Sequence, residues 1–505
     1  MVIMIIVALM PIVGLLTCLL IFKMTAVKSS AYSMLITMAA AYFAYKVDIL
    51  GLSISTAKGL SLSLSIILII WGAVFLYNLV SEVGALNVIN RNIELIIEDR
   101  FIQFLFLSWI FSAFLQGVAG FGVPVVVVVP ILVSMGFEPV ASAAAVLVGH
   151  SWAISFGSMG SSVYAMDMVT NTDIGSIVMW MVFFDIIAMF LTGITVCYIY
   201  GGIPCIKNGI TYIALLTIIM GSTLSIVTKL GMLSMLALLT AFVGLFALYI
   251  IYRLRFKRQS TQRLYSDRLN LMDSLLPYVL IIAFSFMVYF INPQVSISLN
   301  FPGYITAIGN MVKAETNYAM INIFKHPTMI IMVSSLISIV LYRRKKGFDL
   351  KSLKAVASAT VKKCASITIT LAFLISIAVL MMDSGMINCL AQQAVQTTGK
   401  FYPLFAPFVG LLGSFITGSN TNSNVIFGSL QETVANSLGI NPAIMCGVQS
   451  IGASIGGGIG PTTVTLGAAA AQIQGRESRI YNKTLLATLM MALVLGLSNY
   501  YIISF

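Results

Sequence analysis

Uncharged hydrogen-bonding side chains gather at one break in an otherwise apolar part of the chain. From Thr417 to Asn424 the sequence reads Thr-Gly-Ser-Asn-Thr-Asn-Ser-Asn, and seven of these eight positions can hydrogen-bond without carrying charge. A helix that starts after such a break presents free N–H groups and the positive end of its dipole, which suit a carboxylate or another anion. We therefore predict substrate-binding residues here, namely Thr417, Gly418, Ser419, Asn420, Thr421, Ser423 and Asn424.

A second break lies near residue 120 and consists of glycine and proline. The stretch 101–135 has about 35 mostly apolar residues and is interrupted at its centre by Gly117, Gly120, Gly122 and Pro124. Two membrane crossings need about 20 residues each, so two half-length arms fit this stretch better. Backbone groups freed by such a break must be buried in protein or line a watery cavity. We predict the rest of the substrate site at Gln116, Gly117, Gly120 and Gly122.

The composition indicates that these breaks lie in a membrane protein. Hydrophobic residues make up 59% of the 505 residues and charged residues only 9%, with a mean hydropathy of +1.01. A soluble domain carries about a quarter charged residues. The long, continuous apolar runs favour helices over a barrel as the way to satisfy the backbone in lipid. We predict an all-α polytopic membrane protein with one membrane domain over residues 1–505 and about 11 to 14 membrane segments.

The charge pattern gives orientation and excludes several partners. The net charge of +12 is concentrated in two loops, Arg253–Asn270 and Arg343–Lys363, which the positive-inside rule places in the cytoplasm. Without a folded domain to present a basic face, we expect no nucleic acid as partner. Val2–Phe22 is long enough for a retained span, and the same rule places both termini outside a plasma membrane. Six cysteines without ligand spacing predict neither a metal nor a cofactor.

Two pairs of interrupted segments indicate an internal repeat. Phe401–Leu438 matches Phe101–Met135 in length and central break, and each is followed by a second interrupted segment, Pro139–Val163 or Pro442–Gln474. Three glycines and one proline recur at an offset of 303 residues. The charge pattern gives the two copies opposite orientations, as in secondary transporters built from inverted repeats. We predict two re-entrant hairpins and two broken helices, in transport repeats 101–165 and 401–474, with the remaining spans as scaffold.

Ionisable residues inside apolar segments are candidates for binding a coupling ion. Asp185 lies in the middle of Thr172–Ile199, and His150 lies within Pro139–Val163. Each also has a plainer interpretation, because hydrogen bonds to neighbouring helices would satisfy a buried polar group without any further role. We predict His150 and Asp185 as the ion-coupling residues and expect no role for His326 in an outer loop.

The motifs around the breaks resemble the L-lactate permease family, whose members are proton-coupled carriers of lactate and glycolate. The matching stretches are Phe114–Pro124, Met135–Pro139, Ser155–Gly160 and Phe415–Asn424. More distantly, the Ser-Asn-Thr string with paired hairpins resembles the ion-transporter superfamily, which includes sodium-coupled dicarboxylate carriers. That resemblance implies a fixed scaffold domain and a transport domain that moves like an elevator.

Two positions depart from the family pattern. Gln116 stands where the family has glutamate, and Asn420 stands where it has aspartate. If those acids carry the coupling proton, this chain must use His150 or Asp185, couple to sodium, or transport without coupling. A neutral site repels a carboxylate less, so the change is compatible with anion transport.

The leading interpretation is a secondary active transporter of a small monocarboxylate such as L-lactate, glycolate or a similar 2-hydroxy acid. It would move a proton or sodium ion with the substrate by alternating access, and a homodimer is one assembly left open. One alternative is a sodium-coupled carrier of another organic anion. A non-transport subunit of a proton-translocating complex would need a file of intramembrane lysines and glutamates, which the broken segments lack. An enzyme is not expected, because the Gly-Ser-Met-Gly string near His150 is a loose match to an intramembrane protease.

Overall fold

The computed structural model describes residues 2–22, 24–118, 120, 122–255, 270–291, 293–346 and 348–504. Most of the predicted basic loop 253–270 therefore lies outside the described residues. Among the residues described, ten helices are long and apolar enough to cross a membrane. This confirms the prediction of an all-α polytopic membrane protein, while the number of crossings stays a prediction.

Helices make up most of the described chain. The first half forms α1 (Val2–Leu20), α2 (Ala26–Phe43), α3 (Ile49–Glu82), α4 (Ala85–Ile96), α5 (Arg100–Leu105), the π-helix η1 (Phe106–Phe111), α6 (Ser112–Val118), α7 (Val123–Ser134), α8 (Pro139–Gly149), η2 (Ser151–Ile154), α9 (Gly157–Val169) and α10 (Ile174–Lys229). The second half forms η3 (Leu233–Met235), α11 (Leu236–Arg255), α12 (Leu271–Ile291), α13 (Pro327–Lys346), α14 (Leu350–Asp383), α15 (Met386–Thr398), η4 (Gly399–Phe401), α16 (Tyr402–Thr417), α17 (Asn420–Leu438), α18 (Pro442–Gly458), α19 (Pro461–Ala470) and α20 (Glu477–Ser504).

Some boundaries differ from the sequence prediction. The predicted segment Thr172–Ile199 is the first half of α10, which continues to Lys229 after a kink where Gly201 and Gly202 leave helical geometry. α3 and α14 have 34 residues each, and at 1.5 Å per residue they are longer than a hydrocarbon core of about 30 Å. The first arm of the first hairpin spans Arg100–Val118 and has 19 residues, more than a half-length arm. The re-entrant path of that hairpin therefore stays a prediction.

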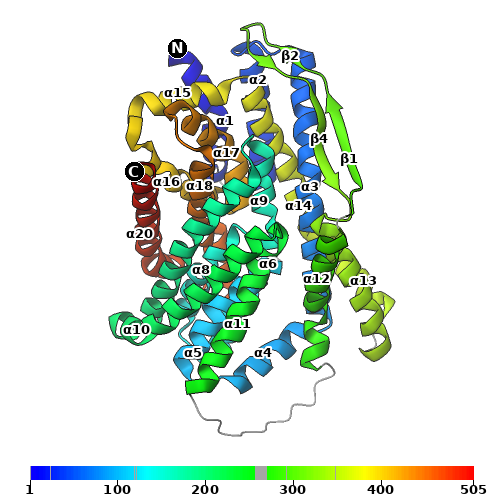
Figure 1. Cartoon of the computed structure of the whole chain (residues 1–505), viewed down its shortest axis with the longest axis vertical. Coiled ribbons are helices and arrows are strands. Elements are labelled where there is room, and N and C mark those ends of the chain that lie inside the picture. The colour runs from blue at the N-terminus through cyan, green and yellow to red at the C-terminus, as the bar shows by residue number, and fades with distance from the viewer. Residues whose placement is uncertain are drawn as a thin grey trace.

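Between α12 and α13 the chain forms β structure that the sequence analysis did not predict. β1 (Ser296–Phe301) pairs antiparallel with β4 (Glu315–Asn322), and β2 (Tyr304–Ile305) pairs with β3 (Met311–Val312). The two longer strands form a ribbon beside α3 (Figure 1). Both are largely exposed or half-buried. The sequence of β1, Ser-Ile-Ser-Leu-Asn-Phe, has the polar–apolar alternation of a strand, which the sequence analysis missed, whereas β4 has no clean alternation.

A buried ion-pair cluster fastens this ribbon to α3 and α14. Lys58 is 2% exposed, and its Nζ lies 2.8 Å from Glu315 Oε1 and 3.2 Å from Asp383 Oδ2. Ser55 donates a hydrogen bond of 2.6 Å to the same Asp383 oxygen. His326, at the far end of the ribbon, is also buried, with its Nε2 2.9 Å from Ser65 Oγ on α3. Burial lowers the pKa of His326 to about 4.

The two hairpins approach the middle of the molecule from opposite ends. α5, which leads into the α6–α7 hairpin, lies at the end that also carries α4 (Figure 1). α15, which leads into the α16–α17 hairpin, lies toward the end that carries the strands. α8 and α18, the helices that follow the hairpins, each end near the middle at a break.

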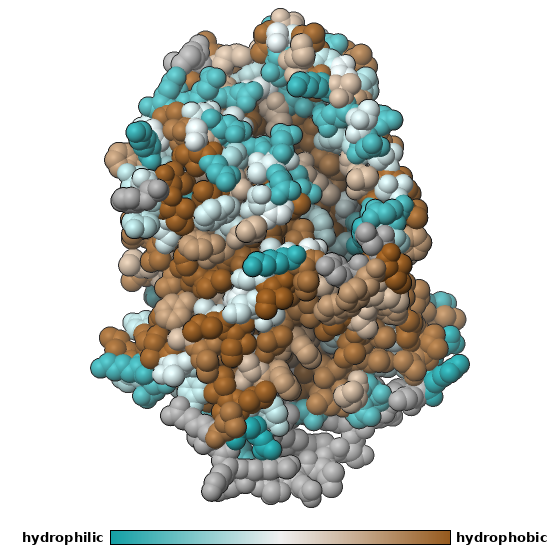
Figure 2. All heavy atoms as spheres, in the orientation of Figure 1, coloured by the Kyte–Doolittle hydropathy of each residue, from teal (hydrophilic) through white to brown (hydrophobic). Residues whose placement is uncertain are grey.

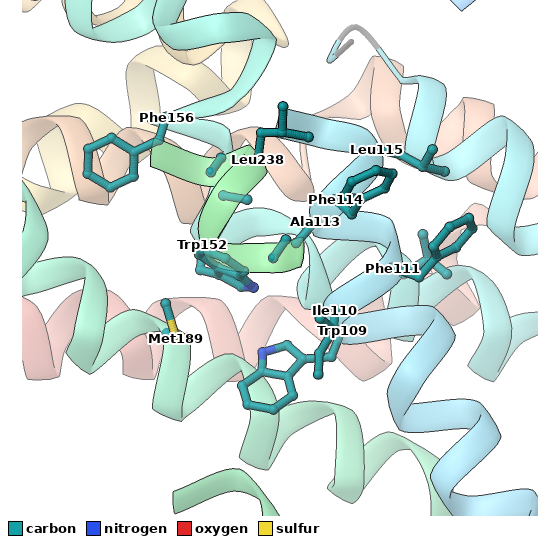
Figure 3. Packing of buried hydrophobic residues seen from close by; sticks show 14 of the residues in the cluster. Trp109, Ile110, Phe111, Ala113, Phe114, Leu115, Trp152, Phe156, Met189 and Leu238 are labelled. Carbon is teal, nitrogen blue, oxygen red and sulfur yellow. The ribbon is translucent and has the colours of Figure 1, made fainter. Parts of the chain in front are cut away.

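Aromatic side chains fill the core around the first hairpin. Trp109, Phe114, Trp152 and Phe156 from η1, α6, η2 and the following turn are buried together (Figure 3). Gly149 allows α8 to touch η1, because a Cβ there would overlap the carbonyl oxygen of Ser108. Small residues at helix contacts permit such close backbone approach in membrane proteins.

The outer surface of the helices is apolar, as a membrane setting requires. α11 exposes Phe242 and Phe246, and α12 exposes Phe286 and Phe290. Hydrophobic residues gather over the half of the molecule where these helices lie, with hydrophilic residues at its rim (Figure 2). A hydrophobic surface of this extent is stable only against lipid.

Candidate functional site

The two hairpins and the two broken segments meet around one cavity of about 240 Å³. Every one of the four segments contributes to its wall. The lining residues are Gln116 and Gly122; His150, Ile154, Ser158, Ser161 and Ser162; Gly418, Ser419, Asn420 and Thr421; and Gly457, Thr462, Thr463 and Leu466. No Asp, Glu, Lys or Arg of the described residues lines this cavity.

Four helices begin at the cavity. α7 starts after Gly122, α17 after Ser419 and α19 after Gly460, and α9 becomes regular after Gly160. The first N–H groups of a helix have no partner within the helix, and the helix dipole places positive potential there. The N-termini bring N–H groups that can bind an anion, the nearby ends of α6, α8, α16 and α18 bring carbonyl groups, and the described residues of the wall carry no permanently charged side chain.

Left-handed backbone at the breaks turns the helix ends toward the cavity. Gly122 has φ of +81° and Gly418 has φ of +69°, a region that glycine enters at little cost. Ser158 and Met159 share this region, with φ of +48° and +55°, although they carry side chains. Strain of this kind persists at functional sites where the surroundings hold it in place. Here the Ser158 hydroxyl accepts a hydrogen bond of 2.8 Å from the backbone N–H of Gly120.

The amide of Asn420, a residue of the cavity wall, has a fixed orientation. Its Nδ2 donates to Ser155 Oγ at 2.8 Å and to the carbonyl oxygen of Ser450 at 3.2 Å. These two bonds determine the orientation of the amide, because a carbonyl oxygen can only accept. The buried Oδ1 then has no hydrogen-bond partner among the described residues. A buried acceptor of this kind favours a ligand that brings a donor.

Among the described residues of the cavity wall, His150 is the one titratable group. Its Nδ1 bonds to the carbonyl oxygen of Val146 in the preceding turn of α8. Because that oxygen can only accept, Nδ1 carries a hydrogen and Nε2 is the basic nitrogen. A proton taken up by His150 would therefore sit on Nε2.

The remaining predicted binding residues support the wall without lining it. They are Gly117, Gly120, Thr417, Ser423 and Asn424. Gly117 packs on α11, where a Cβ would meet the backbone of Leu238. Asn424 Nδ2 donates to Ser162 O at 3.0 Å and to Ser450 Oγ at 2.9 Å, which ties α17 to α9 and α18.

Asp185 lies apart from the cavity. It is fully buried within α10, and its two carboxyl oxygens have no hydrogen-bond partner among the described residues. The structure therefore does not bring the two predicted ion-coupling residues to one site. His150 faces the candidate substrate cavity, and a role for Asp185 stays a prediction.

Sequence reasoning missed several wall residues that follow the second pair of breaks. Ser161 and Ser162 come directly after Gly160, and Thr462 and Thr463 come directly after Gly460 and Pro461. The signal was present, since hydroxyl side chains stand at the first positions after each break. It is the same pattern that marked residues 419–424. The described residues contain no group of three or more His, Cys, Asp or Glu that could hold a metal ion.

A sequence model of the L-lactate permease family matches residues 4–504. This chain belongs to that family. It is 28% identical to an L-lactate permease of Streptococcus iniae over 86% of this chain and 92% of the relative. It is also 26% identical to an L-lactate permease of Escherichia coli (strain K12), over 97% of this chain and 94% of the relative.

A glycolate permease of Escherichia coli (strain K12) is 25% identical over 97% of this chain and 94% of its own length. Among solved structures, the Alcanivorax borkumensis YdaH transporter aligns with a TM-score of 0.48 and 13% identity over 89% of each chain. Membership of a permease family makes this chain a multi-pass membrane transporter. It favours transport over the subunit and protease alternatives.

Proposed function

We propose that this protein is a secondary active transporter of a small monocarboxylate, L-lactate, glycolate or a similar 2-hydroxy acid. The observation that carries the proposal is the small uncharged cavity onto which four helix N-termini open. The relatives named as L-lactate and glycolate permeases support the same substrate class.

A 2-hydroxy monocarboxylate matches the chemistry of the cavity wall. Its carboxylate fits the free N–H groups at the helix N-termini. Its hydroxyl would donate to Asn420 Oδ1, which lacks a partner among the described residues. The methyl group of lactate would pack against Ile154 and Leu466, the aliphatic side chains in the wall. A dicarboxylate would bring a second charge for which the wall has no cationic side chain.

Proton coupling through His150 is the form of coupling we propose. Gln116 and Asn420 are amides and cannot take up a proton at physiological pH, so His150 is left as the proton acceptor in the wall. Sodium remains the alternative, because the wall also offers neutral hydroxyl and carbonyl oxygens. Transport driven by a sodium gradient alone would decide for that alternative.

An inverted repeat is supported by contacts between equivalent residues. At the offset of 303 residues Ser151 corresponds to Ser454, and Ser454 Oγ donates to the carbonyl oxygen of Ser151. Ser155 bonds to Ser450. At the same offset Ser155 corresponds to Gly458 and Ser450 corresponds to Leu147, and Gly458 and Leu147 are also in contact. Such reciprocity is the property of an interface with two-fold symmetry. A pseudo-two-fold axis near Ser151 and Ser454 accounts for it.

A moving unit and a scaffold are supported by the packing of the helices. α3 packs along α14 and near α13, and a Cβ at Gly59 would overlap the backbone of Ser376. We assign these helices, with α1 and α2, to the scaffold. We assign segments 101–165 and 401–474 to the transport unit. Motion of one against the other would give alternating access.

The same picture suggests an orientation in the plasma membrane. α13 ends in a basic segment with Arg343 and Arg344, and that end lies on the same side of the molecule as α4 and α5 (Figure 1). The N-terminus lies at the opposite end, and the C-terminus lies in the same half as the N-terminus. By the positive-inside rule, both termini would face outside.

Uptake of labelled L-lactate into proteoliposomes tests the proposal. We expect uptake under an inward proton gradient and, in the double variant Ser162→Ala with Thr421→Ala, a loss of about tenfold or more in kcat/KM. These two hydroxyls lie 3.0 Å apart in the wall, where they bond to each other. The matched control is Thr433→Ala, which removes a hydroxyl from α17 away from the cavity. Wild-type uptake no faster than in empty liposomes, under proton and sodium gradients alike, would overturn the proposal.

A further inference from the structure

A second cavity, of about 670 Å³, lies next to the candidate site but is separate from it. Its lining includes Tyr164 of α9, Leu233 and Ser234 of η3, Ser285 of α12, and Lys325. Lys325 stands at the base of the β1–β4 ribbon, just before α13 begins (Figure 1). We call this space the Lys325 cavity.

The charge of Lys325 is not compensated within the described part of the chain. Its side chain is half-buried, and no acidic residue described in the structure forms a salt bridge with it. Lys58, another cation near the ribbon, differs because Glu315 and Asp383 neutralise it. An ammonium group in the wall of a low-dielectric cavity concentrates field lines there and raises the local concentration of anions.

Hydroxyl groups complete the wall around this charge. Ser285 is 6% exposed, and its Oγ has no hydrogen-bond partner among the described residues. Tyr164 and Ser234 also line the cavity, and a side-chain hydrogen bond joins their hydroxyls. A buried hydroxyl without a partner is costly, and it favours a ligand that accepts a hydrogen bond. The combination of one ammonium and several hydroxyls suits a carboxylate.

The Lys325 cavity and the candidate site share a wall. Tyr164 of α9 lines the Lys325 cavity, and Ser161 and Ser162 of the same helix line the candidate site. The kink of α9 also rests on η3, since a Cβ at Gly160 would lie 3.1 Å from the carbonyl oxygen of Leu233 and 3.3 Å from Ser234 Cα. A ligand in the Lys325 cavity is therefore one helix away from the transport site.

We propose that the Lys325 cavity is a second binding site for small carboxylates, which collects the anion outside the membrane before it enters the transport site. This rests on the proposed function, because it takes the transported anion as its ligand. Lys325 supplies the attraction and Ser285 donates a hydrogen bond. Since the site acts before the transport step, it governs KM rather than kcat.

The kinetic test compares Lys325→Gln with Lys313→Gln, which removes an exposed lysine in the turn between β3 and β4. For Lys325→Gln we expect KM for L-lactate to rise about three- to tenfold with kcat close to wild type. Raising potassium chloride from about 0.01 M to 0.3 M should raise the wild-type KM and have less effect on the variant. Lys325→Arg should retain the wild-type KM. Equal KM and equal salt dependence in Lys325→Gln, Lys313→Gln and wild type would overturn the proposal.

A chemical test measures the charge preference of the cavity without requiring transport. Leu233→Cys places a thiol in the wall, in a background where the partly exposed Cys18 and Cys389 are serine. The measured quantity is the ratio of the rate with an anionic methanethiosulfonate to the rate with a cationic one. This ratio should be several-fold higher when Lys325 is present than in Lys325→Gln. L-lactate should slow the reaction. An unchanged rate ratio would overturn the proposal. A wild type that shows this preference but transports no carboxylate would refute the proposed function and leave the anion site standing.

Discussion

Replacing Asn420 by aspartate tests whether the amide at the cavity is functional. Asn420 Nδ2 donates two hydrogen bonds, to Ser155 Oγ at 2.8 Å and to the Ser450 carbonyl at 3.2 Å. An ionised aspartate has nearly the same shape but no donor. Its oxygen would face the Ser450 carbonyl oxygen, acceptor against acceptor, and its charge would face the bound carboxylate.

The size of the effect follows from the lost hydrogen bond and the added charge repulsion. An unmade hydrogen bond to a buried acceptor costs about 1–3 kcal/mol. Two unit charges about 5 Å apart at an effective dielectric constant of about 20 repel by about 3 kcal/mol. Together they lower kcat/KM by at least a hundredfold, at about 1.4 kcal/mol per factor of ten. Asn420→Ala loses the bonds without adding a charge, so we expect a loss of about tenfold.

Transport by the two variants should therefore depend differently on pH. A protonated aspartate is neutral and can donate to Ser450 as the amide does, so Asn420→Asp should recover as the pH falls from about 7.5 to 5. Asn420→Ala should not recover, relative to wild type at each pH. The assay is initial L-lactate uptake by proteoliposomes with the internal pH held constant. Equal losses in both variants at every pH would refute a direct role for this amide.

Three further changes test the fold that holds the site. Gly452→Ala should prevent accumulation of folded protein in the membrane, measured by gel filtration in detergent, because a Cβ there overlaps the Pro407 carbonyl; wild-type recovery would show that α16 and α18 can separate. Lys58→Met leaves Asp383 buried without its cation, so the free energy of unfolding should fall by about 3–5 kcal/mol and the melting temperature should fall with it. Adding Asp383→Asn should restore part of the lost stability. Burial lowers the pKa of His326 to about 4 from an unfolded value of 6.5. Its contribution to stability is therefore full above pH 6.5 and is lost as the pH falls toward 4, so the melting temperature of His326→Gln should fall less over that range.

The elements around the site could be predicted because breaks in apolar segments have few physical solutions. Glycine and proline at 117–124 and 418–424 interrupt runs that lipid would otherwise keep helical. The polar residues there need a cavity, and the structure places Gln116, Gly122 and residues 418–421 in one. The same reasoning applied to Gly160 and to Gly460 with Pro461 would have added the hydroxyls that follow them.

What the sequence could not provide was the direction of individual side chains. Ser423 and Thr421 are two residues apart and alike in chemistry, yet Thr421 lines the cavity and Ser423 donates to the Gly410 carbonyl of the neighbouring arm. The sequence predicts Asp185 and His150 alike as ion-coupling residues because both are ionisable in apolar segments, but only the structure shows that Asp185 does not line the cavity. Lys58 also lacked a signal, since its partners lie 257 and 325 residues away.

A neutral wall with one histidine implies a particular form of coupling, which can be measured. When His150 Nε2 is unprotonated, the carboxylate is held by helix N-termini alone; when it is protonated, the cavity gains a positive charge facing the anion. Linkage then requires that protonation tighten L-lactate binding by the same factor by which L-lactate tightens proton binding. We therefore expect the equilibrium affinity for L-lactate in detergent to rise as the pH falls, with uptake of up to one proton per bound anion at pH values between the midpoints of the free and the lactate-bound protein. His150→Gln should bind with a single pH-independent affinity and exchange L-lactate without being driven by a proton gradient. A His150→Gln protein that still concentrates L-lactate under that gradient would show that the proton binds elsewhere, and Asp185 would then be the residue to replace.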